Sequence, residues 1–139
     1  MIDVRSRLPV EKAFQTVIPE GDDVIESASL VGGRLLIGHL RDAHSVLSIH
    51  ALDGARQAEV VLPGLGSVAG VSGRAKDTEA FFGFSGYATP GETWRLDLAT
   101  GSPTLLVRPK IAFDPDAFVT EQVRYASKDG TMVPMFLVH

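Results

Sequence analysis

Residues 47–63 (LSIHALDGARQAEVVLP) and residues 94–110 (WRLDLATGSPTLLVRPK) carry one pattern twice, and this repeat decides the fold. With Gly54 aligned to Gly101, the copies lie 47 residues apart, the difference between those two positions. Each copy contains a short alternating strand, a turn closed by glycine and a second apolar strand that runs to a proline. A period in the forties made of strands alone is typical of β-propeller blades, which are four-stranded antiparallel sheets packed on their neighbours. Because any two hairpins share part of this pattern, the rest of the chain has to support it.

Turn signals around the two copies divide the chain into two sets of four strands. Gly32-Gly33 and Asp53-Gly54 are dipeptides that accept the positive φ angles of tight turns, and Pro63 begins a connector between the sets. The strands are expected at residues 24–31, 34–40, 46–52 and 57–62, then at residues 67–72, 78–84, 93–98 and 104–107. No window shows a helical apolar stripe, and even the best candidate, residues 115–119, is not expected to form a helix. The sequence therefore predicts an all-β fold with about two four-stranded antiparallel blades and a C-terminal β-hairpin.

Both ends of the chain depart from this repeat. Residues 15–19 read as a short apolar strand without a hairpin partner, as the last strand of a preceding blade would. Residues 119–125 and 133–138 read as a hairpin closed by Asp129-Gly130, a strong hairpin signal, and its apolar second strand suits burial on both faces. The expected division is residues 1–22 (last strand of a preceding blade), 23–63 and 64–110 (one blade each) and 111–139 (linker and hairpin).

Composition argues against several classes of partner and site. A chain of 139 residues that is 45% hydrophobic can build the core of one ordinary domain. Its formal net charge of −4 argues against nucleic acid and anionic membranes as partners. The absence of cysteine excludes disulfides and thiolate metal sites, and it favours the cytoplasm while leaving the periplasm open. No signal peptide and no membrane-spanning helix is expected.

The order of these motifs resembles the prolyl oligopeptidase family of serine peptidases. The resemblance is carried by residues 17–54 (VIPEGDDVIESASLVGGRLLIGHLRDAHSVLSIHALDG), 62–73 (LPGLGSVAGVSG), 77–98 (DTEAFFGFSGYATPGETWRLDL) and 121–139 (EQVRYASKDGTMVPMFLVH). The first three segments look like the family's late propeller blades. The last segment is the most specific and looks like the crossing from propeller to α/β-hydrolase domain. Members have a seven-bladed propeller that covers a hydrolase with a Ser-Asp-His triad, which cleaves short peptides after proline.

This resemblance implies that the chain is propeller, with residues 111–139 including the first hairpin of the hydrolase domain. The propeller would act as a lid and size filter, with the hydrolase domain, the other blades and short proline-containing peptides as partners. None of the family's catalytic motifs maps onto this sequence, so the resemblance implies no catalytic residue, metal ligand or cofactor here, and no activity for these residues alone. The alternative is a stand-alone two-blade binding or assembly module. In either case we expect the isolated chain to self-associate through its uncovered faces or edges.

Several glycine motifs could carry chemistry, but each has an ordinary structural interpretation. Residues 70–73 (GVSG) and 83–86 (GFSG) are one residue short of the Gly-x-Ser-x-Gly elbow that exposes a hydrolase nucleophile, and no helix follows them. They are interpreted as turns at the sheet edge. Gly64 and Gly66 lack the lysine and the helix of a phosphate cradle.

Histidines, carboxylates and aromatic residues are interpreted in the same way. His44 and His50 could share one side of a strand, but a metal ion would need a third ligand, for which Asp42 is the near candidate. Solvated histidines of strands and turns are favoured, and His139 is interpreted as the polar end of an apolar strand. The other candidates are His39, the carboxylates Asp22, Asp23, Asp114, Asp116 and Glu121, and the aromatic residues Phe81, Phe82, Phe84 and Trp94. The carboxylates are interpreted as turn and linker charge, and the aromatics as core packing between blades in preference to a binding groove.

Overall fold

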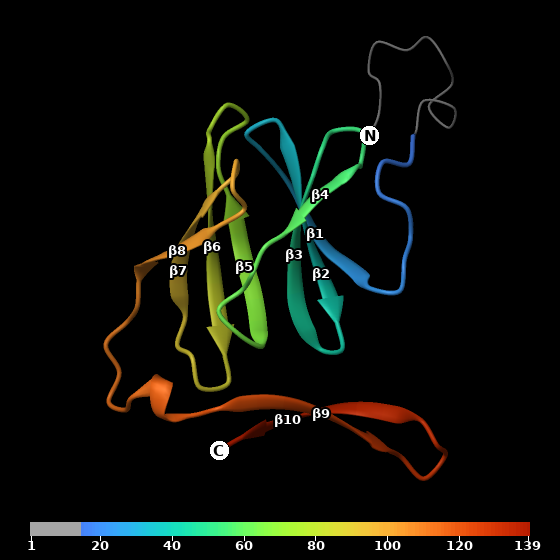
Figure 1. Cartoon of the computed structure of the whole chain (residues 1–139), viewed down its shortest axis with the longest axis vertical. Helices are drawn as coiled ribbons and strands as arrows, with labels where there is room; N and C mark the ends of the chain where they lie inside the picture. The colour runs from blue at the N-terminus through green and yellow to red at the C-terminus, as the bar shows by residue number, and fades with distance from the viewer. Residues whose placement is uncertain (1–14) are drawn as a thin grey trace.

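The computed structural model describes residues 15–139, which form three antiparallel sheets and one short 3-10 helix (Figure 1). The first sheet contains β1 (Val24–Val31), β2 (Arg34–Arg41), β3 (His44–His50) and β4 (Arg56–Glu59). The second contains β5 (Gly66–Ser72), β6 (Glu79–Gly86), β7 (Glu92–Asp97) and β8 (Pro103–Val107). The third sheet is the hairpin of β9 (Thr120–Ala126) and β10 (Met132–Val138), preceded by the 3-10 helix η1 (Pro115–Ala117). The all-β prediction is confirmed, and none of the described helical segments is long and apolar enough to cross a membrane.

In both four-stranded sheets the strand order follows the chain, because every strand pairs antiparallel with the next one across a short connection. Figure 1 shows the two sheets side by side, fanning apart toward their edges, with the hairpin across their lower ends. The inner strands β1 and β5 are neighbours, and Ser29 Oγ donates a hydrogen bond of 3.2 Å to the carbonyl of Val71. The prediction of two neighbouring four-stranded blades plus a hairpin is confirmed.

One hydrophobic core lies between the two blades. It exists because each strand alternates, so that one face of each sheet is apolar and turns toward the other sheet. Leu47 of β3 and Phe82 of β6 are fully buried, and burial of a side chain of this size contributes about 1.5–3 kcal/mol. The buried cluster consists of Val31, Leu36, Leu47, Ile49, Val60, Ala80, Phe82, Phe84, Leu96 and Leu98.

The turn between β1 and β2 brings the backbones of the two blades into contact. Gly32 has a φ of +58°, and its N–H donates a 3.0 Å hydrogen bond to the carbonyl of Arg74 in the second blade. A Cβ on Gly32 would lie 2.4 Å from the carbonyl oxygen of Asp77. Only glycine therefore fits at this point of contact.

One expectation about the ends of the chain is wrong. Residues 15–19 form no strand, because a strand needs a ladder partner and no described strand pairs with this segment. Instead, the carbonyl of Val17 lies against the β3–β4 turn at Gly54. The remainder of the segment 1–22 that was assigned to a preceding blade lies largely outside the described residues. The apolar strand β10, whose composition suits burial on both faces, has β9 as its one neighbour among the described strands, and its residues Met135 and Leu137 are each 40% exposed.

Candidate functional site

His39 and His50 meet at Ser48 on the face of the first sheet that points away from the second sheet. Ser48 Oγ lies 3.2 Å from Nε2 of His39 and 2.9 Å from Nε2 of His50, and it donates to the carbonyl of Ile37 at 3.3 Å. His50 Nδ1 lies 2.9 Å from the carbonyl oxygen of Gly54, so this nitrogen carries a hydrogen. Because His50 is only 6% exposed, the expectation of a solvated histidine is wrong at this position.

This serine–histidine pair is structural and does not present a nucleophile. A hydrolytic serine has to reach its substrate, whereas Ser48 is fully buried within the sheet. Burial is also the main influence on His39, whose pKa it lowers below 6.5, while the nearby charge of Asp23 acts in the opposite direction. The neutral imidazole of His39 is therefore favoured in the folded protein.

The predicted metal candidates do not come together. His44 begins β3 and His50 ends it, so they lie at opposite ends of the strand, and Asp42 is occupied elsewhere. Among residues 15–139, no three histidine or carboxylate side chains lie close enough to hold a metal ion.

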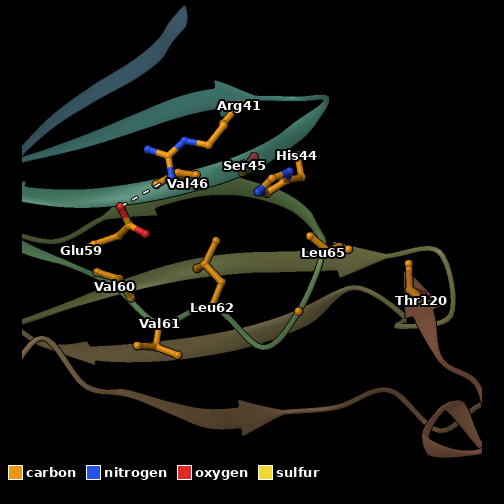
Figure 2. A pocket seen from close by; sticks show the side chains of 11 residues that line it. Arg41, His44, Ser45, Val46, Glu59, Val60, Val61, Leu62, Leu65 and Thr120 are labelled. Atoms are coloured by element: carbon orange, nitrogen blue, oxygen red, sulfur yellow. Dashed lines mark ion pairs between the residues drawn. The ribbon is translucent and has the colours of Figure 1, made fainter. Parts of the chain in front are cut away.

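A cavity of about 450 Å³ opens between the first blade, the connector to the second blade and the start of the hairpin (Figure 2). Arg41 and Glu59 lie on one side of it, where their charged groups are 3.8 Å apart, and Val61 and Leu62 of the connector lie on the other. Thr120, at the first position of β9, completes the lining, so the cavity lies where blade and hairpin meet. Its lining mixes charge with apolar surface, which suits a contact with further polypeptide.

The serine next to this cavity also serves the fold. Ser45 Oγ accepts a hydrogen bond of 3.0 Å from the backbone N–H of Val68 and so connects the two blades. His44, the neighbouring residue, also lines the cavity, but successive residues of a strand project from opposite faces of the sheet. These two side chains therefore do not form a nucleophile–base pair.

Glu92 is a buried, hydrogen-bonded carboxylate that the sequence analysis missed. Its side chain is completely buried on the inner face of β7, where Oε1 accepts from Arg108 Nε at 2.6 Å and Oε2 accepts from Trp94 Nε1 at 2.9 Å. The hydrogen bond and charge of Glu92 raise the pKa of Arg108 above its ordinary value. Arg108 also contacts Asp116 at 3.4 Å. The cluster thus connects the core of the second blade to the linker that leads to the hairpin. The sequence did carry a signal for this burial. Glu92 and Trp94 are two residues apart, so the carboxylate projects from the same face of the strand as the apolar side chains.

The other predicted site residues serve local structure. Asp114 Oδ1 accepts from the N–H of Asp116 at 3.1 Å and so caps η1, while Glu121 lies 3.9 Å from His139. Asp23 pairs with Arg41 at 2.7 Å, and this hydrogen bond lowers the pKa of the Asp23 carboxyl. These carboxylates are turn, strand-end and linker charges, as expected.

The aromatic candidates divide between the two faces of β6. Phe82 and Phe84 are buried in the core, as predicted, and half-buried Trp94 packs against them. Phe81 is half-buried on the opposite face. The interpretation of the glycine–serine motifs as turns is wrong. Residues 83–86 lie within β6, where they pair with β5 and β7, and residues 70–72 lie in β5 at a bulge that shifts its register against β6.

The hairpin contacts the blades through two loops. The backbone carbonyl of Asp42, in the β2–β3 turn, accepts from Gln122 Nε2, and the Asp42 carboxylate forms an ion pair with Arg124. In the β6–β7 loop, the ring of Tyr87 lies 5.0 Å from the ring of Phe136. Asp42, considered above as a metal ligand, thus binds the hairpin.

Comparison with known protein families and sequences identifies the arrangement. Residues 1–109 match the family model described as the N-terminal β-propeller domain of prolyl oligopeptidase. The prolyl endopeptidase of Elizabethkingia miricola is 29% identical over 137 residues, covering 99% of this chain and 19% of the relative. The prolyl oligopeptidase dbiP of Dendrothele bispora is 31% identical over 139 residues, covering 93% and 19%. The chain spans about a fifth of the length of these relatives.

Solved structures show the same arrangement of strands. The apo form of prolyl oligopeptidase B from Galerina marginata matches with a TM-score of 0.79 and 29% identity, covering 88% of this chain and 18% of that one. A structure from a mechanistic study of two prolyl endopeptidases, concerned with inter-domain dynamics, matches with a TM-score of 0.76 and 35% identity over the same shares. The Galerina enzyme bound to a 25mer macrocyclization substrate matches with a TM-score of 0.74 and 29% identity, again covering 88% and 18%.

Proposed function

The chain belongs to the prolyl oligopeptidase family as part of its N-terminal β-propeller domain, and from this membership we propose a function for the whole protein. The protein is a serine endopeptidase that cleaves short peptides after proline, and the segment described here belongs to the cover over its catalytic domain. The family match over residues 1–109 is the observation that carries this proposal. The buried Ser48 and the structural role of Ser45 support a covering role for the blades.

We further propose a division of the chain into three functional parts. Residues 23–63 and 64–110 are consecutive blades of the propeller, and residues 111–139 are the linker and first hairpin of an α/β-hydrolase domain. The two sets of four strands and the separate hairpin support this division. The exposed apolar residues of β10 also support it, since a strand of this composition suits the interior of a hydrolase sheet.

In this proposal the propeller acts as a lid and size filter. Two blades with one continuous core form a rigid wall, so that a substrate has to enter past them as a narrow, unstructured peptide. The test uses the protein encoded by the full reading frame. We expect it to cleave a Gly-Pro chromogenic substrate and a short proline-containing peptide, and to leave the same peptide uncut when it is embedded in a folded protein. Equal cleavage of both forms would contradict the size filter.

The 139 residues alone are proposed to be inactive. The purified chain should neither hydrolyse the Gly-Pro substrate nor be labelled by a fluorophosphonate, which reacts with activated serines. Hydrolysis together with labelling would overturn this part of the proposal and would assign catalysis to the described blades or the hairpin.

We also propose that the isolated chain self-associates through its uncovered blade surfaces. One side of a standard protein interface buries about 800 Å², somewhat more than half of it apolar, which corresponds to gross burial on the order of 10 kcal/mol. The outer strand β8 supports this proposal, since Leu105, Leu106 and Val107 are 36%, 47% and 56% exposed along an edge without a partner among the described strands. An exposed apolar edge strand is a template for pairing with another chain.

A further inference from the structure

A second cavity lies between the two blades, at the ends opposite the hairpin (Figure 1). It has a volume of about 500 Å³, and its walls come from β2, β3 and β4 of the first blade and from the β7–β8 turn of the second. None of its lining residues lines the cavity of Figure 2. We propose that this second cavity binds a carboxylate joined to a small apolar group, with Arg34 as the anion-binding residue.

Arg34 lies at the edge of the core, on the apolar face of β2. It is two residues from Leu36, and side chains two residues apart in a strand project from the same face of the sheet. Leu36 belongs to the buried cluster between the blades, so Arg34 also faces the second blade. There its guanidinium donates a hydrogen bond to the carbonyl of Leu98, directly after β7. A half-buried cation thus lies beside the apolar interior.

The charge of Arg34 has no carboxylate partner in the described part of the chain. Among residues 15–139, every other arginine except the exposed Arg74 forms an ion pair with a carboxylate. A guanidinium carries several N–H donors in a planar fork, and the carbonyl of Leu98 occupies one of them. The remaining donors suit a carboxylate, which a guanidinium binds through paired, parallel hydrogen bonds.

Asp97 ends β7 directly before the cavity, but its carboxylate is bound within its own turn. Oδ1 of Asp97 accepts from the backbone N–H groups of Ala99 and Thr100 at 2.9 and 2.8 Å, and from the Thr100 hydroxyl at 3.0 Å. These bonds, chiefly the one from the Thr100 backbone, lower the pKa of the Asp97 carboxyl. The turn therefore keeps this carboxylate, and the guanidinium of Arg34 remains available to an external anion.

One wall of the cavity is apolar. Ile49 and Leu98 belong to the core, and Ala58 packs against it. Ile49 and Ala58 are paired across β3 and β4, so their side chains form one continuous surface. Apolar walls with a few polar groups are typical of small-molecule sites, and the volume of this cavity is in their range.

A peptide C-terminus and a free carboxylic acid both present this chemistry. They differ in the amide group that adjoins the carboxylate of a peptide. Gln57 and the backbone of the β7–β8 turn also lie on the lining, and they offer polar groups to such an amide. The inference does not rest on the proposed peptidase function, since binding is measured without any catalytic activity.

The test is an NMR titration of the 139-residue chain, with Leu106→Lys added to reduce pairing at the edge of β8. The ligands are N-acetyl-leucine, which has the carboxylate and the apolar group, and N-acetyl-leucinamide, which lacks the charge. We expect N-acetyl-leucine to shift the amide signals of Leu98 and Gly101, with a dissociation constant on the order of 1 mM for a ligand of this size. N-acetyl-leucinamide should bind at least about tenfold more weakly, because it cannot form the charged hydrogen bonds.

Substitutions of Arg34 locate the site. Arg34→Gln should weaken the binding of N-acetyl-leucine about tenfold and remove its advantage over the amide. Arg34→Lys keeps the charge without the fork and should give an intermediate affinity. Arg74→Gln is the matched control, because Arg74 also lacks a carboxylate partner but is exposed and lies outside the lining. It should leave the affinity unchanged.

Ala58→Leu tests the apolar wall and leaves the charge in place. Ala58 faces Gly101 across the cavity, since a Cβ on Gly101 would lie 3.6 Å from the Cβ of Ala58. The larger side chain should fill the space and weaken binding of N-acetyl-leucine. This variant keeps the proposal testable if Arg34→Gln fails to fold.

Isocaproate carries the same carboxylate and apolar group without the amide. Tighter binding of N-acetyl-leucine would identify a peptide end as the ligand, whereas equal or tighter binding of isocaproate would identify a free acid, and both results support the site. The proposal is overturned if N-acetyl-leucine shifts no signal of the β7–β8 turn, or if N-acetyl-leucinamide binds equally well. Equal affinities of Arg34→Gln and Arg74→Gln would overturn it as well.

Discussion

At the scale of single residues, substitutions at the two neighbouring glycines of the β1–β2 turn distinguish the cost of backbone strain from the cost of a steric clash. Gly33 has a φ of +69° and open space where a Cβ would be, whereas a Cβ on Gly32 would meet Asp77 and the side chain of Leu98 at 2.4 and 2.5 Å. Gly33→Ala should lower the free energy of unfolding by about 1–2 kcal/mol, the cost of a left-handed residue. Gly32→Ala should cost a further 1–3 kcal/mol, roughly the penalty of overpacking.

Urea unfolding of both glycine variants measures the difference, provided that the slope of the transition is unchanged. Equal losses in the two variants would mean that the contact between the blades relaxes freely around an added methyl group. In that case the close approach at Gly32 would not constrain how the blades pack.

Glu92 is the residue whose environment depends most strongly on tertiary structure. Glu92→Gln keeps the size of the side chain and removes the charge that binds Arg108, so we expect a loss of about 1–3 kcal/mol in the free energy of unfolding. The indole N–H of Trp94, the one tryptophan of the chain, bonds to the same carboxylate, so its NMR signal should shift in this variant.

The exposed position Glu79 provides the matched control for Glu92. Glu79→Gln should change the free energy of unfolding by less than about 0.5 kcal/mol and leave the indole signal in place. If both variants were equally stable, the buried carboxylate would contribute nothing beyond an exposed one. The connection from the core of the second blade through Arg108 to the linker would then lack an energetic basis.

At the scale of elements, the histidine pair between β2 and β3 makes the first blade sensitive to pH. The pKa of His39 is depressed in the folded protein, chiefly by burial, so the unfolded chain binds its proton more readily. This contribution to stability is fully present above the ordinary value of 6.5, and it is lost as the pH falls toward the depressed folded pKa. His39→Gln should flatten the dependence of the unfolding midpoint on pH in this window.

The exposed His139, at the end of the hairpin strand, provides the control for His39. His139→Gln should leave the pH dependence close to that of the natural sequence. A second loss of stability is expected at lower pH, because the hydrogen bond from Arg41 depresses the pKa of Asp23 below 3.8. An unchanged profile in His39→Gln would show that the buried network does not respond to protons.

At the scale of the whole molecule, the uncovered edge of β8 should determine how the isolated chain behaves in solution. Leu106→Lys places a charge on this edge, a common means by which natural sheets prevent strand pairing. We expect light scattering to show self-association of the natural chain that rises with concentration, and a marked reduction in this variant. Leu52→Lys is the matched control, since Leu52 and Leu106 are each 47% exposed but Leu52 lies in a turn.

A well-behaved monomer over a wide concentration range would contradict the proposed self-association. If Leu52→Lys and Leu106→Lys reduced self-association equally, its cause would be general surface hydrophobicity. Edge pairing by β8 would then be ruled out as the basis of self-association.

The sequence by itself determined the strands, their order and their grouping into two blades and a hairpin. Alternation of apolar residues and glycine turns are local signals, and neighbouring strands of a blade are neighbours in the chain, so no long-range information was needed. The resemblance to the prolyl oligopeptidase family followed from the order of motifs. Boundaries were less certain: β3 begins at His44 and not at residue 46, because Asp42 and Ala43 complete a two-residue turn.

Only the tertiary structure decided which polar residues are buried and what they bind. Glu92 and His50 looked like ordinary strand residues, yet both are buried. Arg108, beyond the next strand, binds the carboxylate of Glu92, and the carbonyl of Gly54 in the following turn bonds to the ring of His50. Residues 15–19 had the composition of a strand but lacked a ladder partner, and the role of Asp42 depends on a hairpin 80 residues further along the chain. Periodicity predicts the face on which a residue lies, whereas burial and hydrogen bonding depend on what packs against that face.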